Sequence, residues 1–192
     1  MTIGVVLKVP CRWSGNASGS NTLYSTTYFR TGLLKTGPGT LRLNSTDATH
    51  YYTEATRVNG GALLVDSRTF LSTNVIVQTG ASIGGTGTVA RVTIEAGGGF
   101  TAAPGQSRAL TAQSISLPGD GIVRLDVPYV GEVGELVPFC IPIVTATGLE
   151  NAKWHVTMNG GEAPDGFDVT AVIENGIVYG CVTKQGLKML VY

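Results

Sequence analysis

The heptapeptide VQTGASI at Val77–Ile83 and the heptapeptide IEAGGGF at Ile94–Phe100 share one pattern at an offset of 17 residues. Both copies follow one pattern: an apolar residue, two variable residues, glycine, a small residue, a variable residue and a second apolar residue. Val75 and Val92 keep the same spacing just before the two copies. A repeat that preserves two apolar positions and a turn glycine together indicates an architecture of stacked, similar units.

Shorter relatives of this pattern stand on either side, VNGGAL at Val58–Leu63 and LPGDGI at Leu117–Ile122. Each unit is a strand, a glycine turn and a second strand, and one such unit cannot bury its apolar side alone. Stacking four units with strands about 4.8 Å apart closes a continuous core. The pattern therefore predicts an all-β fold, a short parallel β-helix, with two apolar columns: Val58, Val77, Ile94 and Leu117 in one, and Leu63, Ile83, Phe100 and Ile122 in the other.

An antiparallel sandwich is the alternative architecture, because it also gives short strands separated by glycine-rich turns. A sandwich has no reason to repeat its apolar positions and its turn glycines in one register, whereas a stack requires that register. The glycines are expected at corners, where the backbone needs positive φ or approaches a neighbouring unit closely.

The chain divides into three expected parts. Residues 1–30 form an N-terminal strand or cover, with one strand around Thr22–Phe29, and residues 31–135 form the β-helix repeats. Residues 136–192 do not contain the repeat and are predicted to form a C-terminal β cap. Terminal units of a stack must differ from the rest, because open ends expose strand edges to end-to-end growth.

The sequence also predicts an antiparallel β-hairpin in that cap. Phe167–Ile173 alternates in polarity, Asn175-Gly176 is a strong two-residue turn, and Ile177–Thr183 alternates again. Asn-Gly between two alternating segments favours a turn with positive φ at both central residues.

Composition excludes several classes of function. The chain has 13 basic and 13 acidic residues, so its formal net charge is zero and no basic stripe indicates a nucleic-acid partner. The apolar runs Ile3–Leu7 and Leu136–Val144 are far shorter than the roughly 20 residues of a membrane helix, so no membrane insertion is expected.

Ile3–Leu7 is also too short for the core of a signal peptide, which suggests that the leader was removed or that the chain is a fragment.

The three cysteines, Cys11, Cys140 and Cys181, show no CxxC spacing and are odd in number. Their pattern indicates neither a redox site nor a metal site. We favour small buried core fillers for all three, with a structural disulfide between Cys140 and Cys181 as the alternative.

The segment GLLKTGPGTLRL at Gly32–Leu43, followed by VNGGAL at Val58–Leu63, GGTGTV at Gly84–Val89 and Pro104-Gly105, resembles the autotransporter-associated β-strand repeat. The resemblance covers about residues 30 to 127 and holds in order as well as in content. It implies a right-handed parallel β-helix exported to the bacterial surface or beyond, as in adhesin-like or polysaccharide-associated proteins. It implies no particular ligand.

Candidate chemistry is sparse. GTGTVA at Gly85–Ala90 fits a dinucleotide fingerprint, but Val89–Glu95 alternates as a strand where that fingerprint needs a helix. His50 and His155 are isolated and expected on the surface or in loops, and no acidic register of a calcium-binding repeat occurs. The acids that could act in a β-helix lyase or hydrolase recur at no fixed offset and are expected in solvated turns; they are Asp120, Asp126, Glu132, Glu135, Asp165 and Asp168.

The side chains best suited to stacking on sugar rings are Trp13, Tyr51, Tyr52 and Trp154, with Tyr51-Tyr52 expected in a loop. We favour packing of these rings on the flank of the stack over sugar binding.

The sequence thus predicts a non-catalytic structural or adhesive module of a secreted or surface-exposed bacterial protein. Its expected partners are extracellular glycans or proteins, and no cofactor, metal or catalytic residue is expected. The alternatives are a carbohydrate-binding module and a polysaccharide lyase or hydrolase of the β-helix type. Ligand-binding residues and oligomeric state are left unassigned.

Overall fold

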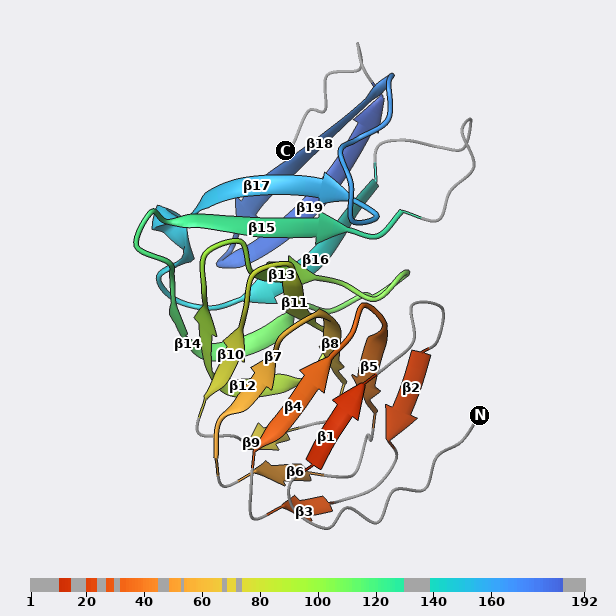
Figure 1. The fold of residues 1–192 in the computed structure, drawn as a ribbon. Helices are drawn as coiled ribbons and strands as arrows, with labels where there is room; N and C mark the ends of the chain where they lie inside the picture. Colours follow the sequence, from red (N-terminus) through yellow and green to blue (C-terminus); the bar gives the residue numbers. More distant parts are fainter. Residues whose placement is uncertain are drawn as a thin grey trace.

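The computed structural model describes residues 11–14, 20–23, 27–29, 32–44, 49–52, 54–66, 69–71, 74–129 and 139–184. These residues form an all-β fold of 19 strands, with a single 3-10 turn at Leu149–Asn151. Figure 1 shows β1, β4 and β7 side by side in one part of the molecule and the hairpin β18–β19 at the opposite end.

One sheet is parallel throughout (Figure 1). Its strands follow each other in chain order. Between two neighbouring strands of this sheet, the chain forms at least one strand of the other sheet. In order they are β2 (Ser20–Leu23), β5 (Thr40–Leu43), β8 (Gly61–Val65), β11 (Ala81–Gly84), β13 (Gly99–Thr101), β15 (Ile122–Val127) and β17 (Lys153–Met158).

The second sheet is parallel for seven strands and then turns antiparallel. The parallel strands are β1 (Cys11–Ser14), β4 (Leu33–Thr36), β7 (Thr56–Val58), β10 (Val75–Val77), β12 (Thr88–Ile94), β14 (Leu110–Ser116) and β16 (Phe139–Thr145). β19 (Ile177–Lys184) pairs antiparallel with β16, and β18 (Phe167–Glu174) pairs antiparallel with β19.

A third strand row joins the second sheet through one long strand. β3 (Thr27–Phe29), β6 (Thr49–Tyr52) and β9 (Thr69–Leu71) pair in parallel with one another. β9 then pairs with the first half of β12 at Val89, while Val92 in the second half pairs with Val75 of β10. The chain therefore passes through three strand rows in turn, and parallel pairing from β1 to β17 excludes the antiparallel sandwich.

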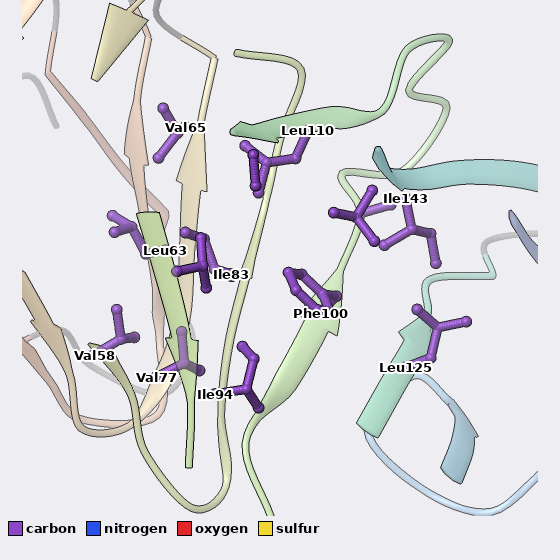
Figure 2. Close-up of a cluster of buried hydrophobic side chains, with 14 of the residues drawn as sticks. Val58, Leu63, Val65, Val77, Ile83, Ile94, Phe100, Leu110, Leu125 and Ile143 are labelled. Atoms are coloured by element: carbon purple, nitrogen blue, oxygen red, sulfur yellow. The ribbon is translucent and has the colours of Figure 1, made fainter. Parts of the chain in front are cut away.

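The 17-residue repeat lies in register in space. Val77 pairs with Ile94 and Ile83 pairs with Phe100, each in parallel strands. Figure 2 shows the four side chains gathered within one buried cluster, and each is at most 1% exposed. The alignment extends back to Val58 and Leu63, which pair with Val77 and Ile83.

The last unit departs from the predicted columns. Ile122 is 45% exposed, and Leu125, fully buried, pairs with Phe100 instead. The connection between paired positions is longer here: seven positions separate Thr93 from Phe100, whereas nine separate their partners Ser116 and Leu125. Leu125 therefore takes the inward position, and Ile122, of the opposite parity in β15, points outward. Leu117 lies just after the end of β14 and packs against the core while partly buried.

Two glycines show why the corners reject a side chain. Gly85 has φ of 108°, and a Cβ there would overlap the backbone of Val65 in the preceding unit. Gly99 pairs with Arg124, and a Cβ on Gly99 would overlap the Arg124 carbonyl oxygen. Close approach of neighbouring units thus depends on glycine at these positions.

The predicted C-terminal hairpin is confirmed. β18 and β19 pair across the turn Asn175-Gly176, whose φ values of 51° and 75° fit a two-residue turn with positive φ at both positions.

The expectation that the cysteines are unlinked core fillers is wrong for two of them. Cys140 on β16 and Cys181 on β19 lie directly opposite each other in the antiparallel register, with Cα atoms 4.1 Å apart, and form a disulfide. Cys11 lies in β1, and its side chain falls outside the described part of the chain.

Candidate functional site

A groove of about 350 Å³ lies on the outer face of the fully parallel sheet. It follows from the alternation of side chains in each strand: Leu41, Leu63 and Ile83 point into the core, so their neighbours point outward. The outward row Thr40, Ala62 and Ser82 has short side chains, which leaves the sheet surface hollow.

One end of the groove carries two charged residues of β15, Arg124 and Asp126. The Arg124 guanidinium donates through Nη2 to the carbonyl oxygens of Gly80 and Ala81, at 3.3 and 3.1 Å. It thereby ties β15 to the turn that precedes β11, although β13 lies between the two strands.

Asp126 is held by three donors. Its carboxylate accepts hydrogen bonds from the Thr157 hydroxyl at 2.8 Å, the Gly160 N–H at 2.6 Å and the Thr101 hydroxyl at 3.5 Å. These contacts join three successive strands of the sheet, β13, β15 and β17. Asp126 therefore organises the end of the groove, and it is the sole carboxylate among the described lining residues, whereas glycoside hydrolysis ordinarily uses two.

The other candidate acids are spread over different elements. Asp120 is exposed in the turn before β15, Asp165 is exposed in the segment before β18, and Asp168 is exposed on β18 itself. Glu132 and Glu135 lie outside the described residues.

The histidines occupy separate strands. His155 is on β17, and its Nε2 lies 3.8 Å from Glu162, with both side chains exposed. Such an exposed contact contributes little to stability. His50 is in β6, and its side chain is not described. Within the described ranges no three His, Cys, Asp or Glu side chains come together in a way that could hold a metal ion.

Gly85–Ala90, the segment that fits a dinucleotide fingerprint, leads into strand β12 rather than a helix. Across the described residues, no helix has the length and apolar character needed to cross a membrane.

The aromatic residues do not follow the sequence prediction in every case. Tyr51 and Tyr52 were expected in a loop, but both lie in β6 and Tyr52 is 4% exposed, so the loop prediction is wrong. Trp154 on β17 is half-buried and packs against the core, in line with the favoured flank-packing role. Trp13 and Tyr51 lie in strands whose side chains are not described.

Sequence reasoning overlooked Lys35, whose side chain is fully buried. Its ammonium donates to the carbonyl oxygens of Thr36, Gly37 and Gly60 at 3.0, 2.8 and 2.9 Å. It therefore joins the turn after β4 to the turn between β7 and β8 in the next unit. Burial lowers the pKa of Lys35 from its usual 10.5. The signal was present, because Lys35 shares the inward parity of Leu33 in an alternating strand.

A second missed network lies at the carboxyl ends of β5, β8 and β11 in the fully parallel sheet. Asp66, 6% exposed at its side chain, pairs with Arg42 and accepts hydrogen bonds from the N–H and hydroxyl of Thr86 at 2.9 and 3.2 Å. One carboxylate thus links three consecutive units, a contact that spacing alone does not reveal.

No family model, no curated protein and no solved structure matches this chain. The resemblance to the autotransporter-associated repeat therefore depends on the quoted residues alone and stays a prediction.

Proposed function

We propose that the chain is a structural or adhesive module, a right-handed parallel β-helix that spaces or presents surfaces outside a bacterial cell. The observation that carries the proposal is the parallel register kept from β1 and β2 through β16 and β17. A stack in which each unit contacts only its neighbours is an extended, stiff body whose length grows with the number of units. Such a body serves well as a spacer.

The cross-strand disulfide supports a location outside the cytosol. Structural disulfides persist in oxidising compartments and are rare where thiol reductants are abundant. The bond between Cys140 and Cys181 joins the hairpin to the last parallel strand of its sheet, so it belongs to the folded architecture.

The hairpin also supports the role of a terminal module. β19 pairs with the edge of β16 in the antiparallel sense, so that edge cannot accept another parallel unit. A terminal unit of this kind would protect the end of a stack from end-to-end growth.

The test is a screen of the full chain against neutral and acidic polysaccharides, with binding and turnover measured in the same wells. A structural module gives no new reducing ends and no unsaturated products. Turnover that is lost in Asp126→Asn and kept in the exposed control Asp168→Asn would overturn the proposal in favour of an enzyme. Adhesive and purely spacing roles are separated by whether any glycan is retained.

A further inference from the structure

A second hollow, of about 470 Å³, lies on a different face, over β12, β14, β16 and β19. Its described lining residues are rich in hydroxyl groups and include one cation and one aromatic ring. The side chains that matter for its chemistry are Thr88, Thr111, Thr145, Ser107, Arg108 and Tyr179.

The threonines form a row because of the strand register. Thr88 pairs with Thr111, and Thr111 pairs with Thr145, so one threonine comes from each of three neighbouring strands. Val89 and Val144 next to them are fully buried, so the threonines point to the outer face. Their hydroxyl groups therefore repeat at about the 4.8 Å spacing of the strands.

The loop that supplies Ser107 and Arg108 is anchored to the same sheet. The Gln106 side chain donates to the Pro142 carbonyl oxygen on β16 at 2.7 Å and accepts the Ala103 N–H at 2.9 Å. This double contact fixes the loop before any ligand arrives, which lowers the entropic cost of binding.

The charge of the pocket selects the ligand. Arg108 is exposed, and within the described part of the chain it makes no ion pair. No carboxylate is found among the described residues that line the pocket. A guanidinium binds a carboxylate through two parallel hydrogen bonds, and hydroxyl side chains both donate and accept, as sugar hydroxyls require.

Tyr179 completes the arrangement. It is half-buried on β19, directly opposite Pro142, and lines the pocket with an apolar ring and a polar hydroxyl. An amphipathic ring of this kind packs on the apolar face of a sugar while its hydroxyl stays hydrogen-bonded.

We propose that this pocket binds a sugar unit that bears a carboxylate. Arg108 binds the carboxylate, the threonine row and Ser107 bind the sugar hydroxyls, and Tyr179 packs against the ring. The pocket volume lies within the range of small-ligand sites, about 300–1,000 Å³. The proposal does not depend on the spacing role, because a stiff module with or without an export route can carry this site.

The experiment is calorimetric titration of the full chain, at low salt, with galacturonate and mannuronate trimers. The expected result is saturable binding to at least one trimer, and weaker binding to its methyl ester, which lacks the charge. Arg108→Gln should weaken binding of the acid on the order of tenfold and leave the ester unchanged. The matched control Arg57→Gln, an exposed arginine on β7, should bind as the wild type does.

A second variant tests the hydroxyl row. Thr111→Val keeps the shape and the strand preference of the side chain but removes its hydroxyl, and it should weaken binding several-fold. Thr170→Val, an exposed threonine on β18, is its control. The proposal fails if neither trimer binds, if the methyl ester binds equally well, or if Arg108→Gln and Thr111→Val bind like their controls. A glutamate tripeptide that binds as tightly as the sugar acid would overturn the saccharide assignment and indicate a peptide ligand.

Discussion

The parallel stack and the C-terminal hairpin differ in what fixes the register of neighbouring strands. In the stack, partners such as Val58, Val77 and Ile94 come from separate units, and the units approach so closely that corner positions admit only glycine. In the hairpin, partners are close in sequence and the Asn175-Gly176 turn fixes their register, while the disulfide joins β19 to β16 of the stack. A change at one corner of the stack should therefore disturb two units, whereas a change in the hairpin should stay local.

The largest effect is expected from Gly85→Ala. Alanine at φ of 108° is strained, and its Cβ overlaps the backbone of Val65, so the two units must separate. We expect a loss of about 4 kcal/mol or more in the free energy of unfolding, or no folded protein at all. Urea denaturation followed by circular dichroism measures this. Gly119→Ala, at a glycine with ordinary φ and open space around it, should change stability by less than about 1 kcal/mol. Equal effects of the two changes would remove the close-approach argument.

The next largest effect is expected from Phe100→Ala in the core of the stack. Phe100 is fully buried between Ile83 and Leu125, and its loss leaves a cavity that neighbouring units cannot fill (Figure 2). Such a change costs about 3–5 kcal/mol. Ile173→Ala in the hairpin, where the side chain is 46% exposed, should cost under about 1 kcal/mol. The comparison fails if thermal melts shift equally for both variants.

The sequence predicted the part of the fold that repeats. The columns through Val77 and Ile94 were visible because two adjacent units have the same length and the same turn. The prediction failed at Ile122 because two more residues separate Ser116 from Leu125 than separate their partners Thr93 and Phe100, and this changes which residue of β15 faces the core. Tyr52 was misplaced because the third strand row, to which β6 belongs, has strands of three or four residues before β12 and no glycine pattern to mark it.

The sites were harder to predict than the columns. The pocket around Arg108 draws on residues from Thr86 to Tyr179, and its threonine row exists only once three strands lie in register. The disulfide likewise depends on the register of β16 with β19, which a separation of 41 residues does not reveal. Contacts between distant segments that share no motif cannot be obtained from spacing.

Removal of the disulfide should have an intermediate effect, confined to the hairpin. The bond closes a loop between residues 41 apart, for which loss of the cross-link costs about 2–4 kcal/mol. In the double variant Cys140→Ala, Cys181→Ala, hydrogen exchange should accelerate in β18 and β19 and stay slow in β10 and β11. Uniform acceleration in both regions would show that the hairpin and the stack unfold as one unit.

The smallest effect, and the one with a distinctive pH dependence, is expected at Lys35. Its ammonium satisfies three buried carbonyl groups across two units, and Lys35→Met leaves them without that donor. We expect a loss of about 1–3 kcal/mol at pH 7. Burial lowers the pKa of Lys35 in the folded chain below the 10.5 of the unfolded chain, so the unfolded chain holds the proton more tightly.

The sign of the pH dependence follows from that difference. As pH rises from the folded pKa toward 10.5, the contribution of Lys35 to stability increases, and below the folded pKa it is constant. The methionine variant lacks this rise, so the stability gap between wild type and variant should widen with pH. Lys153→Met, at an exposed lysine of β17, corrects for other groups that titrate in the same range. A gap that stays flat or narrows toward pH 10.5 in denaturation curves would show that burial does not disfavour the charged lysine, and that the three carbonyls compensate its desolvation in full.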